Sequence, residues 1–317
     1  MKVVKKLAVL GKRAAGPVFL AVGFFDGFHR GHQAVVGRCV ATARRSSGGA
    51  AWVLTFDKHP LRVLAPGHAP PLLTATAHKL KLLKNAGLDG CVVLPFSRSL
   101  AGEEPEAFVR RVAGTVPNLK RFFVGSNWTF GRAARGTPAL LRREAARYGV
   151  ATTTVHPLTW RGKPISSTRI RQALRAGQLR EASRMLGRTV SVMGRVVPGK
   201  RIGGARVGFP TANLYPHSEV WPPFGVYAAY ADVKGQTLKA VVNVGLCPTV
   251  SRRGRAAPSM EVHLLDFRER LYGTMLEVFF VGKLRDECAF DSVTALRAQI
   301  QRDIRDATRM LESTPRP

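Results

Sequence analysis

Two histidines three residues apart stand out in the segment GFFDGFHRGH, which follows the first long apolar run of the chain. Gly23, Gly27 and Gly31 allow tight turns there, and His29 and His32 stand at an expected helix start, where both imidazoles can face one phosphate chain. A glycine-rich turn with two solvated histidines is the alternative, and the spacing alone does not exclude it. The position directly after a strand favours phosphate binding.

A second group of candidate phosphate ligands lies in the segment ISSTRIR. Ser166, Ser167 and Thr168 precede an expected helix, and Arg169 and Arg171 follow them. Hydroxyl groups, the unpaired backbone amides of a first helical turn and guanidinium groups together suit a phosphate. Serine and threonine before a helix usually act only as caps, which is the competing interpretation. The histidine segment earlier in the chain weakens that interpretation.

The second half of the chain contains a glycine- and arginine-rich stretch that ends in PTAN. Thr211 and Asn213 place a hydroxyl and an amide oxygen two residues apart, which predicts a nucleotide loop followed by a metal site. A flexible hairpin between barrel strands is the alternative for the glycines. The candidate residues of the loop are Gly199, Lys200, Gly203 and Gly208.

The elements that must position these residues differ between the two halves. In the first half, short apolar runs alternate with amphipathic stretches, which indicates buried parallel strands separated by helices. That order predicts an α/β fold with a doubly wound sheet. The expected strands cover residues 18–25, 50–56, 90–96, 121–125 and 151–157.

Near Gly187 the hydrophobic period changes from helical to alternating. Alternating runs separated by Gly, Pro and charged turns predict an antiparallel barrel or sandwich. A last segment, 292–311, repeats apolar residues on one helical face, so we expect a helix packed on the barrel. The predicted domains are therefore residues 1–186 and 187–317.

Composition limits the class and location of the protein. A length of 317 residues suits two domains, and 45% hydrophobic with 22% charged residues is ordinary for globular proteins. Four scattered cysteines without a CxxC pair argue against a zinc site or a disulfide framework. The start lacks the pattern of a secretory signal, and no run of about 18 apolar residues occurs, so we expect a cytoplasmic protein without a membrane partner.

Two further segments narrow the interpretation. TFDKHP and VGSNWTFGRAARG lie in this order between the histidine segment and ISSTRIR. The series resembles the HIGH-type nucleotidyltransferases, and within them the bacterial bifunctional riboflavin kinase/FMN adenylyltransferase (FAD synthetase) family. GFPTANL, MEVHLLDF and LYG resemble the riboflavin kinase half of that family. The resemblance implies a Rossmann-like domain followed by a small kinase β-barrel with a C-terminal helix.

For the first half, the resemblance implies that FMN attacks ATP to give FAD and pyrophosphate. An FMN phosphate is mostly dianionic at pH 7, so positioning and charge neutralisation suffice and a protein base is not needed. The segment GSNWTFG implies flavin contacts from Asn127 and Phe130, with Trp128 standing where phenylalanine is typical. The implied ATP-binding set, with His29 and His32 as catalytic residues, is Gly23, Phe25, Asp26, Gly27, His29, Gly31, His32, Ser166, Ser167, Thr168 and Arg171.

For the second half, the resemblance implies ATP-dependent phosphorylation of riboflavin to FMN. Thr211 and Asn213 are expected to hold Mg²⁺ on the ATP phosphates, while the glycine loop wraps them. Glu261 in the EVH segment is expected to accept the proton of the ribityl 5′-hydroxyl, because an alcohol is a poor nucleophile. Arg285 is expected near the flavin. An exposed position on an alternating strand is the alternative for Glu261.

The charge supports a rival hypothesis. Lysine and arginine number 50 against 20 acidic residues, and a formal charge of +30 attracts the phosphates of ATP and of RNA alike. A basic RNA-binding protein on a nucleotidyltransferase scaffold, or a single-activity kinase whose first half has degraded, are therefore the alternatives. No RNA-binding motif is recognisable in the sequence, so we expect no dedicated nucleic-acid partner. The oligomeric state is left open.

Overall fold

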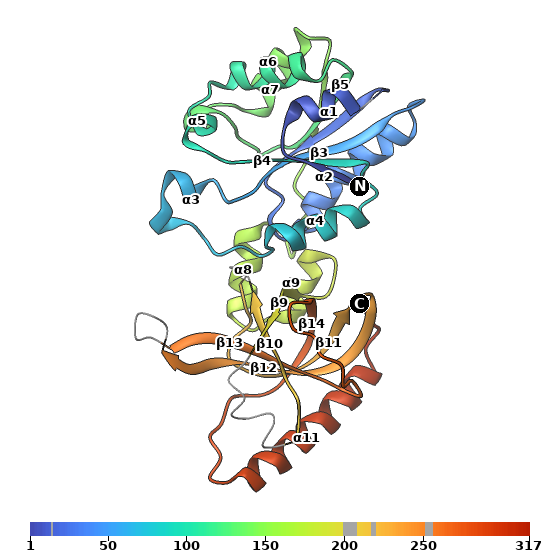
Figure 1. The fold of residues 1–317 in the computed structure, drawn as a ribbon. Coiled ribbons are helices and arrows are strands. Elements are labelled where there is room, and N and C mark those ends of the chain that lie inside the picture. The colour runs from blue at the N-terminus through green and yellow to red at the C-terminus, as the bar shows by residue number, and fades with distance from the viewer. Residues whose placement is uncertain (14, 199–207, 217–219, 251–255) are drawn as a thin grey trace. The chain divides into compact units, whose positions relative to one another are not determined.

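A computed structural model describes the chain except for residues 14, 199–207, 217–219 and 251–255. The described chain divides into two compact units, Met1–Ser167 and Thr168–Pro317. The first unit contains a parallel sheet and the second a closed barrel (Figure 1). Among the described residues, no helix is both long and apolar enough to cross a membrane.

Six parallel strands form the sheet of the first unit, in the order β1-β4-β3-β2-β5-β6. The predicted doubly wound sheet is confirmed. The edge strand β1 was not predicted, because three residues in a basic N-terminus give no strand signal. The strands are β1 (Lys2–Val4), β2 (Val18–Val22), β3 (Ala50–Phe56), β4 (Gly90–Leu94), β5 (Leu119–Gly125) and β6 (Ala151–Val155).

Helices cover both faces of this sheet, because each central strand is apolar on both sides. In β2, Val18, Leu20 and Val22 pack into one core with α1, α6 and α7, whereas Phe19 and Ala21 pack into the other with α2 and α4. A small hairpin, β7 (Thr159–Trp160) and β8 (Lys163–Pro164), follows β6. The helices are α1 (Leu7–Arg13), α2 (Arg30–Arg44), α3 (Leu61–Leu64), α4 (Thr76–Asn85), α5 (Arg98–Ala101), α6 (Pro105–Thr115) and α7 (Pro138–Ala146).

The second unit is a barrel of antiparallel strands in the closed order β10-β13-β12-β11-β14-β9. A barrel is therefore observed rather than a sandwich. Helices α8 (Ser167–Arg175) and α9 (Leu179–Leu186) precede it, and α11 (Val293–Glu312) ends the chain. The strands are β9 (Ser191–Val197), β10 (Ala212–Pro216), β11 (Gly225–Val233), β12 (Gln236–Val250), β13 (Ala256–Leu264) and β14 (Met275–Arg285).

The predicted C-terminal helix packs on the outer wall of the barrel. Ala307 and Leu311 of α11 join Ala228 and Tyr230 of β11 in one apolar cluster. The buried Tyr230 hydroxyl donates to the Leu311 carbonyl at 2.7 Å, so its polar atom is satisfied inside this contact. The amphipathic pattern of the last segment thus fixes α11 against the barrel.

The sheet order determines where the motifs of the first unit lie. Strand β2 is central, with β3 and β5 as its neighbours, and all three are parallel. Their carboxyl ends therefore meet at one edge, which is where open α/β sheets bind ligands. The histidine segment follows β2, TFDKHP spans the end of β3, and GSNWTFG begins at the end of β5.

Candidate active sites

The loop after β2 needs glycine because of its backbone and its packing. Phe25 and Gly27 have φ angles of 57° and 76°, in the left-handed region. The Gly27 amide donates to Thr74 Oγ1 at 3.0 Å, and a Cβ at this position would lie 2.7 Å from the Leu73 side chain. At Gly23, a Cβ would be 3.0 Å from the Phe25 ring. The loop is thus folded tightly against the segment around residues 73 and 74.

Asp26 anchors the same loop and contacts the segment ISSTRIR, residues 165–171, which we call the serine segment. Its side chain is 3% exposed, and its carboxylate accepts hydrogen bonds from the amides of Leu73 and Thr74 at 3.0 and 3.1 Å. The Ser167 hydroxyl donates to the Asp26 carbonyl at 2.9 Å. The structure therefore brings the two predicted phosphate-binding segments together. Because its carboxylate faces backbone amides, Asp26 shapes the loop.

His29 and His32 lie in the first turn of α2. His29 caps the helix, since its Nδ1 accepts from the His32 amide at 3.4 Å, and the two rings stack with centroids 3.6 Å apart. A Cβ on Gly31 would lie 3.1 Å from the His29 ring, so glycine leaves room for this stack. Both imidazoles are thereby held at a helix N-terminus, where backbone amides favour an anion.

His32 is held in its neutral form. Burial lowers its pKa well below the usual value, and the charges of His29 and Lys79 lower it further. Among the residues that the structure describes, its buried Nδ1 atom has no hydrogen-bond partner, and its ring and that of Phe25 meet edge to face with centroids 5.4 Å apart. A neutral imidazole with an unsatisfied nitrogen can form a hydrogen bond to a ligand without a change in its own charge.

The remaining residues of the serine segment divide between the units. Ser166 and Ser167 are half-buried and belong to the first unit, whereas Thr168 and Arg171 lie on α8 in the second. Their contacts with ATP stay predictions.

In the segment after β5, Trp128 is more exposed than Phe130, and the predicted flavin contacts of Asn127 and Phe130 stay predictions. Phe130 is 8% exposed and packs on Phe108 with ring centroids 5.5 Å apart. Trp128 stacks on Phe130 with centroids 4.6 Å apart and is partly exposed, and Asn127 is exposed. Phe130 thus supports the ring of Trp128, and Trp128 offers the aromatic face that a flavin could stack on.

A cavity of about 500 Å³ opens beside the carboxyl end of β4. No motif in the sequence pointed to this cavity. Glu103 and Arg111 form a two-pronged ion pair there with both N to O distances at 2.7 Å, and the Arg132 amide, from beyond β5, donates to the Glu103 carbonyl. The lining residues are Leu94, Pro95, Ser97, Ser99, Leu100, Gly102, Glu103 and Arg111.

In the second unit, strand register places three polar residues in a row. Glu261 on β13 pairs with Asn213 on β10 and with Asn243 on β12. Thr211, directly before β10, forms a side-chain hydrogen bond to Glu261. Burial and the nearby charge of Glu287 raise the pKa of the Glu261 carboxyl, which the Thr211 bond partly offsets. A carboxylate made more basic in this way suits proton acceptance.

Glu261 lines a cavity of about 300 Å³ between the barrel wall, the segment after β14 and α11. His263 lies two residues further along β13, and its Nδ1 is 2.8 Å from the carbonyl oxygen of Pro210, which positions the PTAN segment. The cavity is mostly apolar with a polar end. Its lining residues are Phe209, Thr211, Val226, Val241, Asn243, Glu261, His263, Arg285, Glu287, Cys288, Phe290, Leu296, Ile300 and Asp303.

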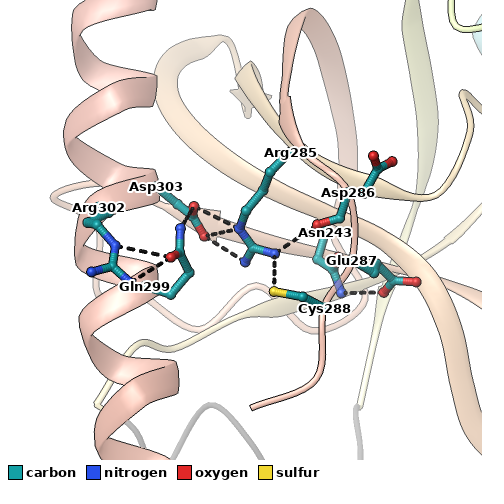
Figure 2. Close-up of polar contacts among 8 residues, drawn as sticks. All are labelled: Asn243, Arg285, Asp286, Glu287, Cys288, Gln299, Arg302 and Asp303. Carbon is teal, nitrogen blue, oxygen red and sulfur yellow. Dashed lines mark hydrogen bonds and ion pairs between the residues drawn. The ribbon is translucent and has the colours of Figure 1, made fainter.

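Arg285 is fixed at the other side of this cavity by α11. Its Nε and Nη2 donate to the Asp303 carboxylate at 2.9 and 2.8 Å, and Nη1 lies 3.3 Å from Cys288 Sγ (Figure 2). Gln299 also donates to Asp303, at 2.8 Å. The guanidinium group is therefore a rigid part of the cavity wall.

A second cavity of about 200 Å³ shares Thr211 with the first. Arg268, Glu269, Arg270 and Tyr272 contribute charged and aromatic residues to it. Gly208, at φ 84°, begins the described part of the approach to PTAN. The predicted loop residues Gly199, Lys200 and Gly203 lie outside the described residues. Thr211 thus lines two cavities, and the second also contains two arginines.

Comparison with known proteins identifies a family for each half of the chain. A family model described as FAD synthetase matches residues 12–169, and one described as riboflavin kinase matches residues 186–311. Bifunctional riboflavin kinase/FMN adenylyltransferases from Haemophilus influenzae and Escherichia coli are 33% and 34% identical to this chain. These matches cover 93% and 96% of this chain and 94% and 96% of the relatives. The chain belongs to this family.

The bifunctional riboflavin kinase/FMN adenylyltransferase family also fits the fold. The relative from Bacillus subtilis is 33% identical over 92% of this chain and 91% of its own. A solved structure described as a macrolide-efflux protein from Streptococcus pneumoniae superposes with a TM-score of 0.82 at 28% identity, over 97% of this chain and 99% of that one. The predicted family, with one FAD synthetase and one riboflavin kinase domain, and its use of ATP and flavins are confirmed. The predicted boundary between residues 186 and 187 stays a prediction.

No motif in the sequence pointed to Asn243 and Glu287, which contact each other in the barrel cavity. Glu287 accepts a hydrogen bond from Asn243 Nδ2 at 3.3 Å, and its carboxylate occupies the space that a Cβ on Gly245 would fill. The available signal was the isolated asparagine in the apolar run LKAVVNVG, together with the glycine two residues later. An amide within a buried strand needs a partner, and Glu287 supplies it.

Proposed function

We propose that the barrel cavity containing Glu261 binds riboflavin and that the adjoining cavity binds the ATP phosphates. That Thr211 lines both cavities carries this assignment, since phosphoryl transfer needs donor and acceptor to meet. Apolar walls suit the isoalloxazine ring, and the end with Glu261 and Asn243 suits ribityl hydroxyls. Arginines in the second cavity suit phosphate.

These positions suit transfer of the γ-phosphoryl group from ATP to riboflavin. The ribityl 5′-oxygen attacks the γ-phosphorus of ATP, the bond from that phosphorus to the β–γ bridging oxygen breaks, and ADP leaves. Glu261 takes the hydroxyl proton as the new P–O bond forms. The raised pKa of its carboxyl helps it to hold that proton.

The residues present fit a magnesium ion. Thr211 bonds to Glu261 through its hydroxyl hydrogen, which leaves oxygen lone pairs, and Asn213 adds an amide oxygen beside them. Mg²⁺ prefers a few protein oxygens together with phosphates and waters. Thr211 and Asn213 would hold it, and the ion would neutralise charge on the ATP phosphates.

The first unit is proposed to form FAD at the carboxyl edge of its sheet. An FMN phosphate oxygen attacks the α-phosphorus of ATP, the bond to the α–β bridging oxygen breaks, and pyrophosphate leaves. His29, His32 and the first-turn amides of α2 bind the phosphates, and Trp128 and Asn127 contact the flavin. Incubation of the protein with riboflavin and MgATP tests the whole proposal: FMN should appear first, then FAD.

Two further predictions remain part of this proposal. A cytoplasmic location follows from the composition, and general basicity rather than a dedicated RNA site accounts for the charge of +30. Tight, sequence-selective RNA binding at physiological salt would contradict the second.

Replacement of Gly245 by alanine is expected to weaken riboflavin binding. The added methyl group would displace the Glu287 carboxylate and leave Asn243 without its partner. Loss of about one hydrogen bond raises KM for riboflavin about tenfold. The measurement is steady-state FMN formation, with Leu246→Ala, at the exposed neighbouring position on β12, as the control. An unchanged KM in the Gly245 variant would show that Glu287 has no part in binding.

Two fragments test whether the kinase is separable. Fragment 187–317 follows the predicted boundary, whereas fragment 168–317 also keeps α8 and α9. Helix α9 contacts β14, and the Val190 amide donates to Ser183 Oγ at 3.2 Å. We expect both fragments to phosphorylate riboflavin, with a lower melting temperature for the shorter one. A folded fragment 168–317 that does not bind MgATP would refute the kinase assignment.

A further inference from the structure

Lys79 on α4 is a buried lysine to which the proposed reactions give no role. Its side chain is 2% exposed, and Nζ donates to the carbonyls of Phe24 and Phe56 at 3.1 and 2.9 Å and to Thr55 Oγ1 at 3.2 Å. Thr55 in turn donates to the Phe24 carbonyl at 3.0 Å. All three ammonium protons thus have acceptors. These acceptors belong to the end of β3 and to the loop of residues 24–27, which we call the histidine loop.

The segment just before α4 also forms hydrogen bonds to the histidine loop. Thr74, two residues before α4, accepts from the Gly27 amide, and its own amide donates to the Asp26 carboxylate. The loop from residue 24 to 27 is therefore held at one end by Lys79 and at the other by Thr74. Loss of the lysine would leave the Phe24 carbonyl with Thr55 as its donor and would weaken the end that leads out of β2.

The charge of Lys79 is felt by the groups around it. Burial lowers its pKa to about 8, against the opposing effect of Asp26, Cys91 and Asp57. Burial raises the pKa of the Cys91 thiol to about 12, so this neighbour stays neutral near pH 8. The ammonium group also lowers the pKa of His32, so its field reaches the histidine pair.

We propose that Lys79 is a positioning residue for adenylyl transfer, which ties the histidine loop to the end of β3 and places a fixed positive charge behind the histidine pair. A reaction without a protein base depends on positioning and on charge neutralisation, and Lys79 supplies both through its neighbours. This inference rests on the proposed assignment of FAD formation to the first unit.

Lys79→Met tests the inference, because methionine keeps the length and apolar bulk but removes the charge and all three hydrogen bonds. FAD formation from supplied FMN should fall about 100-fold. Riboflavin phosphorylation in the same sample should stay within about twofold, since the barrel is a separate unit. Lys84→Met, at an exposed position of the same helix, is the matched control and should leave FAD formation unchanged. A folded Lys79→Met protein with wild-type FAD formation would overturn the inference.

The pH profile of FAD formation also tests the role of Lys79. The ammonium form of Lys79 is the active one, so kcat/KM for ATP in FAD formation should decline as pH rises through about 8. Lys79→Met should lack this decline. Because the pKa is lower in the folded state, the unfolded chain binds more protons above pH 8, and this residue's contribution to the free energy of unfolding rises there. The decline therefore does not report unfolding.

The outcomes separate the inference from the proposed function. A flat wild-type profile up to about pH 9.5 would remove Lys79 from the reaction but leave FAD formation intact. A wild-type protein that makes FMN and no FAD would instead refute the assignment of the first unit.

Discussion

Replacement of Glu261 by glutamine is expected to lower riboflavin phosphorylation by about 100-fold or more. Glutamine keeps the size of the side chain and can still accept a hydrogen bond from Thr211, but it cannot take the proton of the 5′-hydroxyl. The affinity for MgATP should change little, because the row that Glu261 shares with Asn213 and Asn243 is preserved. The measurement is initial-rate FMN formation together with MgATP titration.

A second variant separates chemistry from binding at this site. Asn213→Ala removes a proposed magnesium ligand, so it should weaken MgATP binding itself. FAD formation from supplied FMN should survive both changes, which shows that the first unit is intact. Near-normal riboflavin phosphorylation by a folded Glu261→Gln protein would mean that the base lies elsewhere.

Replacement of His32 by alanine is expected to abolish measurable FAD formation, a loss of about 100-fold or more. The variant removes a hydrogen-bonding group in the first turn of α2 and breaks the ring stack with His29. Because the pKa of His32 is lowered, its imidazole is neutral at pH 7 and no loss of FAD formation is expected between pH 6.5 and 8 from its titration. The measurement is FAD released from FMN and MgATP.

Two controls test whether the loss of FAD formation comes from the His32 side chain itself. Riboflavin phosphorylation by the same His32→Ala sample should be normal. His32→Asn, which retains a neutral hydrogen-bonding group, should recover part of the lost FAD formation. Unchanged FAD output from His32→Ala would contradict the assignment of the histidine segment.

The sequence predicted the sheet because its central strands are apolar on both faces, and a pattern of that kind needs no tertiary context. Strand β1 escaped prediction because three residues gain their stability from pairing with β4. The Asn213–Glu261–Asn243 row also escaped, since register between strands far apart in sequence is set by the closed barrel. Motifs thus predicted the candidate site residues, but they did not predict which of these residues contact one another.

The roles of single side chains depended on packing that a motif does not encode. Asp26 stands in the histidine segment, yet its carboxylate binds backbone amides of residues 73 and 74. Phe130 matches a flavin-contacting pattern, yet it is buried under Trp128. Lys79 had no motif at all, because its three acceptors come together only when α4 meets the ends of β2 and β3.

The ion pair between Arg285 and Asp303 affects the order in which the two units can be completed during synthesis. One wall of the barrel cavity comes from α11, which follows the barrel strands in the chain. A growing chain can complete its parallel sheet while α11 is still unmade, since domains fold from the N-terminus as they emerge. Asp303 and the apolar face of α11 are made after the sheet and the barrel strands, and only then does Arg285 gain its partner. During synthesis the parallel sheet can therefore fold before the barrel cavity is complete.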